Sequence, residues 1–254
     1  PAPTFGEAAR AEIFLQRLSD AQADFCSADD FNNPVGVISG TSGGEKPPIF
    51  VVANLDTVFS ADIDHDYTIR KNTITGPGII DNSASIGVMA SLPFVLRKLG
   101  IRFQSDIILA GVARSIGKGN LAGARHLLAN WKEPIRGAVI LAGTPLGMLN
   151  YYSEGIIRGE IHCDTGIPAE RVHLYKPNAI LILNGVIDCI LRMRLPQRPR
   201  SRVIIGRING GHKHGVIALH ADIGFEIQSD SDKMVKQILT ELEDIVNGTA
   251  QEHH

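Results

Sequence analysis

The chain has 254 residues, 44% of them hydrophobic and 20% charged, and a formal net charge of −2. This composition is typical of a globular chain long enough for one large domain or two smaller ones. The near balance of charges argues against a nucleic acid or an anionic membrane as partner. Three widely spaced cysteines, Cys26, Cys163 and Cys189, argue against a disulfide framework and favour a reducing, cytoplasmic location.

The sequence predicts neither a signal peptide nor a membrane span. The opening stretch "PAPTFGEAARAEIF" is too polar for a signal peptide, and the chain has no continuously apolar run of about 18 residues. We therefore expect neither a leader nor a membrane span. The terminal "EHH" resembles part of a purification tag, so His253 and His254 are not counted as ligands.

Residues 1–156 show the pattern of an α/β domain. Helical spacing of apolar residues near the start predicts an amphipathic helix, and Ile49–Ala53 reads as a buried strand after a Gly- and Pro-rich turn. A short exposed strand and a Gly-Pro-Gly turn precede a helix that is predicted to begin near Asn82, to kink at Pro93 and to end at Gly100.

The apolar runs "DIILAGVA" and "GAVILAG" flank a predicted helix, "NLAGARHLLANW". Such runs are typical of buried parallel strands joined by crossover helices. We therefore expect a layered, mostly parallel sheet.

Residues 157–250 change to a β-α-β-β-α order, which predicts a small sheet with helices on one face. Two strands are joined through "NGGHKHG", and Asp230 is the expected N-cap of the last helix. Closing such a sheet normally takes another strand, and none follows. We expect an uncovered edge or the absence of a further part of the natural protein.

Four segments together resemble the M20 metallopeptidases, the group of aminoacylases, deacetylases and di-/tripeptidases. They are "ANLDTVF", "ITGPGIIDNSASIG", "GKGNLAGARHLL" and "VIIGRINGGHKHGVIALHADIGFEI", in register across roughly residues 5–247. The resemblance implies a zinc-peptidase-like α/β domain with helices on both faces of its sheet. It also implies a smaller α+β lid domain that dimerises in many members. The C-terminal segment that completes the first domain in the family is not recognised here.

The mechanism that the resemblance implies uses two zinc ions bridged by one Asp. A separate Glu acts as general base on a bridging water. Asp81 matches the bridging Asp and is the only family-type metal ligand retained. The first His ligand is replaced by Asn54, although Asp56, which would orient that His, remains as a vestige. Ser115 or Arg114, depending on the alignment, stands where the general base is expected.

Other functional positions of the family differ as well. Ile116 or Ser115 takes the second place of the Glu pair, and Ala142 replaces the next acidic ligand. In the lid, only His173 lies near the expected catalytic His, while Gly215 and Gln228 replace an Asn and an Arg that help to bind a substrate carboxylate.

The resemblance with these losses predicts a pseudoenzyme that has no metal-dependent hydrolase activity, an empty metal site and no other cofactor. We expect it to act as a binding or regulatory subunit, paired with itself through the lid or with a related subunit. A small molecule remains a candidate ligand, because polar residues follow the strand ends where α/β folds bind ligands. The candidate pocket residues are Asn54, Asp56, Asp81, Asn82, Arg114 and Ser115.

Two alternatives stay open. One is an active zinc-dependent amidohydrolase or peptidase on acylated amino acids or short peptides, with an atypical site around Asp56, Asp81 and a partner chain. The other is a fragment of an incomplete or rearranged gene product. Asp81 itself also fits an ordinary helix-capping role in "DNS", and we favour that structural role.

Two charged clusters have simpler interpretations than binding. His212 and His214, with His220 nearby, suggest a metal site, but no acid or Cys completes the ligand set. A solvated hairpin turn is the favoured interpretation. A basic run lacks the interleaved aromatics of RNA-binding surfaces, so a solvated helix end is favoured. It comprises Arg192, Arg194, Arg198, Arg200 and Arg202.

Overall fold

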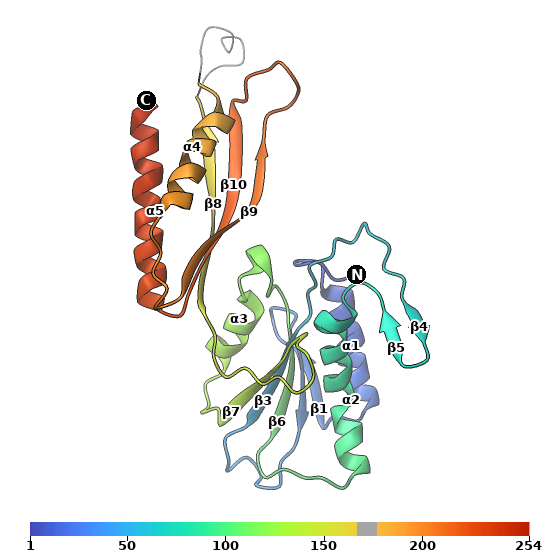
Figure 1. Cartoon of the computed structure of the whole chain (residues 1–254). Coiled ribbons are helices and arrows are strands. Elements are labelled where there is room, and N and C mark those ends of the chain that lie inside the picture. The colour runs from blue at the N-terminus through green and yellow to red at the C-terminus, as the bar shows by residue number, and fades with distance from the viewer. Residues whose placement is uncertain (167–176, 254) are drawn as a thin grey trace. The chain divides into compact units, whose positions relative to one another are not determined.

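The computed structural model describes residues 1–166 and 177–253 (Figure 1). The chain divides into two units, Pro1–Met148 and Leu149–His254. The sequence-based boundary was placed after residue 156, just inside the first strand of the second unit. His173 lies outside the described residues.

The first unit contains a five-stranded sheet in the order β1-β2-β6-β3-β7. The strands β6, β3 and β7 pair in parallel, while β2 pairs antiparallel with both β1 and β6, so β2 alone runs against the others. The sheet is therefore mostly parallel, as predicted. The bounds are Phe25–Ala28 (β1), Pro34–Ile38 (β2), Ile49–Asn54 (β3), Ile107–Val112 (β6) and Gly137–Leu141 (β7).

Helices cover both faces of this sheet (Figure 1). On one face, helices α1 (Ala8–Asp20) and α2 (Ala84–Lys98) pack against alternate strand residues such as Ala53 and Leu109. On the other face, α3 (Ala122–Asn130) packs against the intervening residues. Successive strand side chains point to opposite faces, so the fully apolar run of β6 supplies both cores.

The segment before α2 is irregular. A two-stranded hairpin, β4 (Thr68–Arg70) with β5 (Thr73–Thr75), is followed by a π-helical turn, Ile79–Ser83. Because Asp81 and Asn82 in that turn have non-helical dihedral angles, α2 begins at Ala84 rather than near Asn82. Pro93 lies inside α2, and the helix continues past it to Lys98.

Within residues 1–166 and 177–253, one span, Ile79–Lys98, is long and apolar enough to cross a membrane by length and composition alone. Its residues Ile86 and Met89 are buried in the core of the first unit. A core helix of a globular protein passes the same test, so this feature is weak evidence for a membrane segment.

The second unit contains an antiparallel three-stranded sheet in the order β8-β10-β9, with two helices on one face (Figure 1). This arrangement agrees with the β-α-β-β-α pattern. Its core lies between the helices and the strand residues that face them, among them Leu183, Ile223 and Ile238. The bounds are Gly155–Asp164 (β8), Ala179–Arg192 (α4), Ser201–Gly210 (β9), His220–Ser229 (β10) and Asp232–Glu252 (α5).

The predicted N-cap of α5 was wrong by one residue. The cap is Ser231, whose hydroxyl oxygen accepts a hydrogen bond of 3.4 Å from the Met234 N–H. The Asp230 carboxylate instead accepts the Arg200 backbone N–H at 3.3 Å. Both residue types are good caps, and the pairing with Arg200 engages Asp230 before the helix begins.

Candidate functional site

The carboxyl edge of the parallel strands brings together polar residues that are far apart in sequence. Asn54 ends β3 and is in register with Val112 at the end of β6, while Leu141 ends β7 beside Ala53. The turn before α2 reaches the same edge through Asn82. In α/β folds, ligands bind outside the carboxyl ends of the strands, so this edge is the candidate site.

A pair of side-chain amides occupies the centre of this edge. The Asn82 Nδ2 group donates to Asn54 Oδ1 at 2.8 Å and to the Leu141 carbonyl at 3.0 Å. The Asn54 Nδ2 group in turn donates to the Asp56 carbonyl at 2.8 Å. Both polar atoms of the Asn54 side chain are therefore held by protein groups.

Asn82 is fully buried, yet its Oδ1 atom has no hydrogen-bond partner among the described residues. A buried carbonyl oxygen without a donor costs about 1–3 kcal/mol in stability. The hydrogen bonds from Nδ2 to Asn54 and Leu141 fix the orientation of the amide. Its oxygen then faces no hydrogen-bond donor within the described residues.

Asp56 lies at the same edge but faces the protein. Its side chain is 0% exposed, and its Oδ2 atom accepts hydrogen bonds from Thr4 Oγ1 and from the backbone N–H groups of Ser115 and Ile116. These donors lie at 2.9, 2.8 and 2.7 Å. The carboxylate thus joins the N-terminal segment to the loop after β6, and no oxygen of Asp56 is open to solvent.

A half-buried cation lies near this carboxylate. Arg10 of α1 donates from Nη1 to the Leu55 carbonyl at 3.1 Å. Burial lowers the pKa of Arg10, and the negative charge of Asp56 partly offsets that effect. Since an arginine remains charged in proteins, Arg10 supplies a fixed positive charge close to Asp56.

Asp81 is the one candidate carboxylate that faces outward. It is exposed and makes no hydrogen bond or ion pair with the residues that the structure describes. Its main chain lies against Gly143, where an added Cβ would come within 2.5 Å of the Asp81 Cβ. Only glycine fits at position 143, which keeps the loop after β7 close to Asp81.

Arg114 and Ser115 follow β6, but their side chains have structural contacts. The Arg114 guanidinium lies over the Phe31 ring at 4.4 Å and the Phe5 ring at 5.6 Å, a cation–π arrangement. The buried Ser115 hydroxyl donates to the Val112 carbonyl at 3.4 Å. Neither side chain is placed as a general base, because a guanidinium has no acceptor and this hydroxyl has no base beside it.

The sequence analysis did not identify Glu7 and Asn33 as residues of this edge. Glu7 accepts the Arg114 backbone N–H at 2.8 Å, and the fully buried Asn33 accepts the Ala113 N–H at 2.9 Å. Asn33 also donates to the Gly123 carbonyl at 3.0 Å. These contacts join segments 80 to 107 residues apart, so no local spacing predicts them.

The donor set at this edge does not fit the zinc pair that the resemblance implies. Within residues 1–166 and 177–253, no group of three or more His, Cys, Asp or Glu side chains is arranged to hold a metal ion. Among the described residues at the edge, Asp81 alone offers a free carboxylate, Asn54 is hydrogen-bonded to Asn82, and the side chain of Ala142 has no ligand atom. Zinc in proteins takes about four ligands, mostly imidazole, thiolate or carboxylate.

The other predicted clusters lie in the second unit and are solvated. His212 and His214 are exposed in the β9–β10 connection, and the exposed His220 contacts Asp164 at 3.2 Å. Gly215 lies in the same connection, and Gln228 accepts a hydrogen bond from Arg202 on the sheet surface.

The basic run is largely paired with acids. Arg200 and Arg202 both contact Glu154, and Arg192 contacts Asp188 at 3.7 Å. These ion pairs leave the arginines on an exposed, mixed-charge surface. They agree with the interpretation as a solvated helix end and loop.

Three solved structures are similar to this chain along nearly its whole length. Aminopeptidase PepT from Bacillus cereus is 18% identical with a TM-score of 0.61, covering 99% of this chain and 69% of that one. The aminobenzoyl-glutamate utilization protein from Klebsiella pneumoniae is 12% identical with a TM-score of 0.73, covering 99% and 69%. The YXEP protein from Bacillus subtilis, described as a dinuclear metal binding peptidase from the M20 family, is 13% identical with a TM-score of 0.59, covering 100% and 67%.

No protein-family model and no curated protein matches the sequence. The likeness to the solved structures lies below 25% identity and therefore concerns the fold. At that level it confirms the resemblance: the chain has an M20-like fold.

Proposed function

We propose that this protein is an M20-like pseudoenzyme, without metal-dependent hydrolase activity, that acts as a binding or regulatory subunit. The observation that supports this most directly is the hydrogen bond between Asn82 and Asn54. This bond joins Asn54, which stands where the resemblance implies a His ligand, to a second neutral amide.

The chemistry of zinc-dependent hydrolysis explains why this matters. A zinc ion supplies hydrolytic power by lowering the pKa of a bound water, and a nearby carboxylate accepts the proton. Here Asp81 is a single exposed carboxylate, and Ser115 is engaged with the Val112 carbonyl. One acid cannot both hold a metal and serve as the base, so we expect no hydrolysis by this route.

The binding role is assigned to the second unit, through which we expect the chain to form a homodimer. The strand β9 pairs only with β10 and leaves an edge free among the described strands. Ile208 on β9 and Leu181 on α4 are 56% and 67% exposed. Free strand edges beside apolar side chains favour pairing with another chain.

We further place the protein in the cytoplasm, where thiols stay reduced. Cys26, Cys163 and Cys189 are all free in the structure. Asp81 and the groups around it remain a candidate site for a small polar ligand that needs no metal.

Zinc content and hydrolysis together test the loss of function. Protein without His253 and His254 is equilibrated with zinc, desalted and measured by elemental analysis. We expect far less than one zinc ion per chain, and no hydrolysis of acylated amino acids or short peptides above background.

Two zinc ions per chain, lost in Asp81→Ala together with a measurable hydrolysis rate, would support the active amidohydrolase instead. Asp62→Ala is the matched control, because Asp62 is an exposed acid of the same unit whose hydrogen bonds within the described residues go to Ser60 alone. Zinc that persists in Asp81→Ala would reveal a site elsewhere in the chain.

A further inference from the structure

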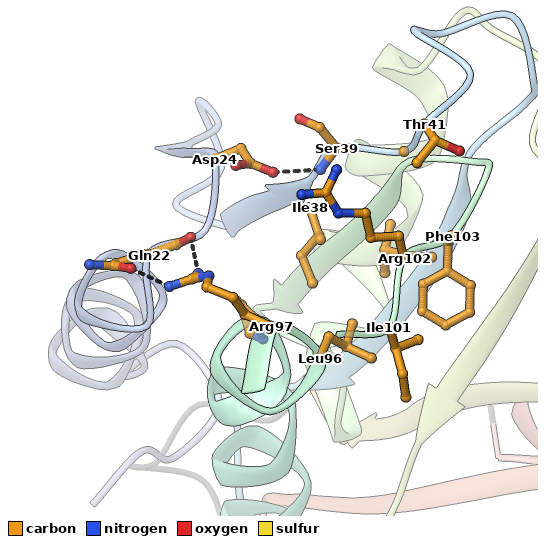
Figure 2. A pocket seen from close by; sticks show the side chains of 13 residues that line it. Gln22, Asp24, Ile38, Ser39, Thr41, Leu96, Arg97, Ile101, Arg102 and Phe103 are labelled. Carbon is orange, nitrogen blue, oxygen red and sulfur yellow. Dashed lines mark hydrogen bonds between the residues drawn. The ribbon is translucent and has the colours of Figure 1, made fainter. Parts of the chain in front are cut away.

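A pocket lies in the first unit at the end of the sheet opposite Asn54 and Asp81. It has a volume of about 390 Å³. It is formed where β2 ends and β6 begins, between the segment after α1 and the segment after α2 (Figure 2). This volume lies within the usual range of small-molecule sites, roughly 300–1,000 Å³.

Backbone hydrogen bonds fix the walls of this pocket. The Thr41 N–H donates to the Phe103 carbonyl at 2.9 Å, and the Ile101 N–H donates to the Leu96 carbonyl at 2.9 Å. A site whose walls are already held in place loses little conformational entropy when a ligand binds. The pocket is therefore largely preformed.

Two arginines contribute to the lining in different ways. Arg97 is anchored, since its Nη2 atom donates to the Ala21 and Gln22 carbonyls at 2.9 and 2.7 Å and its Nη1 atom donates to the Gln22 side chain. Arg102 makes no hydrogen bond or ion pair with any part of the chain that the structure describes. Its guanidinium is therefore available to an external acceptor, and it reaches across the pocket in Figure 2.

The only carboxylate in the lining limits the charge that the pocket accepts. Asp24 accepts the Ser39 backbone N–H at 2.7 Å (Figure 2). With Arg97 and Arg102 against Asp24, the lining carries one net positive charge. A monoanion matches this balance, whereas the second charge of a dianion would be repelled by Asp24.

Part of the remaining lining is apolar and lies beside the polar residues Gln22, Ser39 and Thr41. Leu96 and Ile107 are buried at the base, and Ile101 and Phe103 are 45% and 42% exposed beside them. Apolar surface of this kind gains from contact with a hydrocarbon group, which a hydrated inorganic anion does not provide.

We propose that this pocket binds a small organic monocarboxylate with an apolar chain or ring. The carboxylate pairs with the Arg102 guanidinium, which offers two parallel N–H donors, and the apolar part packs on Ile101 and Phe103.

The test uses the full chain, without added zinc, in calorimetric titrations with isocaproate and hydrocinnamate. Isocaproamide, the uncharged counterpart, and inorganic phosphate serve as comparison probes. We expect both carboxylates to bind with a dissociation constant on the order of 1 mM or tighter, and the amide at least about tenfold more weakly. Because the pocket lies at the opposite edge of the sheet, this result is independent of zinc binding and hydrolysis.

Two variants separate the charged and apolar contacts. Arg102→Gln should weaken carboxylate binding about tenfold or more. Ile101→Ser should weaken hydrocinnamate binding but not the binding of acetate, which is added as a carboxylate probe without a large apolar group. Arg70→Gln is the control, because Arg70 is an exposed arginine on β4 whose side chain has no partner among the described residues. Both Arg102 and Ile101 are exposed, so neither change should unfold the protein.

Three results would overturn the proposal. The first is the absence of binding by either carboxylate. The second is equal affinity in wild type and Arg102→Gln. The third is phosphate binding as tight as carboxylate binding, which would indicate an anion site without apolar recognition.

Discussion

The side-chain amide of Asn82 donates to the side-chain oxygen of Asn54 at 2.8 Å, across 28 residues of sequence. This contact ties the turn before α2 to the end of β3. The Asn82 amide also donates to the Leu141 carbonyl, so this one side chain links three segments at the carboxyl edge. Its loss should therefore be measurable as a loss of stability.

Asn82→Ala is expected to lower the free energy of unfolding of the first unit by about 2 kcal/mol, because Asn54 Oδ1 and the Leu141 carbonyl lose their donor. Removal of the unpartnered Asn82 Oδ1 limits the loss. Urea unfolding can be followed by the fluorescence of Trp131, the single tryptophan, which packs edge-on against Phe50 in the core of this unit. Asn72→Ala, at an exposed turn position between β4 and β5 of the same unit, is the control. A change below about 0.5 kcal/mol in Asn82→Ala would contradict a structural role.

Asp56→Ala is expected to destabilise the first unit by about 3 kcal/mol or more, since the Ser115 and Ile116 N–H groups are left without their acceptor. Asp56→Asn keeps one acceptor oxygen and should cost less. The same Trp131 fluorescence assay measures both variants. If Asp56→Asn and Asp56→Ala were equally destabilising, the hydrogen-bond explanation would fail.

The proposed homodimer predicts that the protein sediments as a dimer at micromolar concentration. Replacing Ile208 and Leu181 together by Glu should shift it to a monomer, because two exposed apolar groups of the second unit become charged. The control Ile69→Glu changes an isoleucine of β4 that is 66% exposed and should leave the dimer intact. A wild-type monomer under these conditions would argue against the proposed interface through the second unit.

The three cysteines should react with iodoacetamide at different rates. Burial raises the pKa of Cys26, and burial together with the charge of Asp164 raises the pKa of Cys163. A raised pKa means less thiolate at about pH 7, so both should react slowly and accelerate as the pH rises through their pKa values. Cys189 is exposed and should be modified first.

Peptide mass mapping after timed labelling identifies the modified cysteines. In Cys189→Ser, the fast phase should disappear while the two slow ones remain. Early modification of Cys26 at about pH 7 would show that burial does not protect it.

The elements of this fold could be predicted well because their signals are local. The apolar run of β6 and the helical spacing in α1, α4 and α5 reflect the two side-chain periods of strand and helix. The order and spacing of the four motifs along the chain were likewise sufficient to identify the resemblance to the M20 fold. Local signals are less exact at element ends, as the shift of the α5 cap from Asp230 to Ser231 illustrates.

The sequence by itself also determined which chemical groups are present: Asn54 where a His is expected, and Asp81 as a lone acid. Only the tertiary structure decided what those groups do. It showed that Asn54 is bound to Asn82, that Asp56 faces Thr4 and the loop after β6, and that Arg114 stacks on Phe5 and Phe31. The physical reason is that sheet pairing and helix packing place these segments side by side, and the resulting contacts depend on geometry that no local spacing encodes.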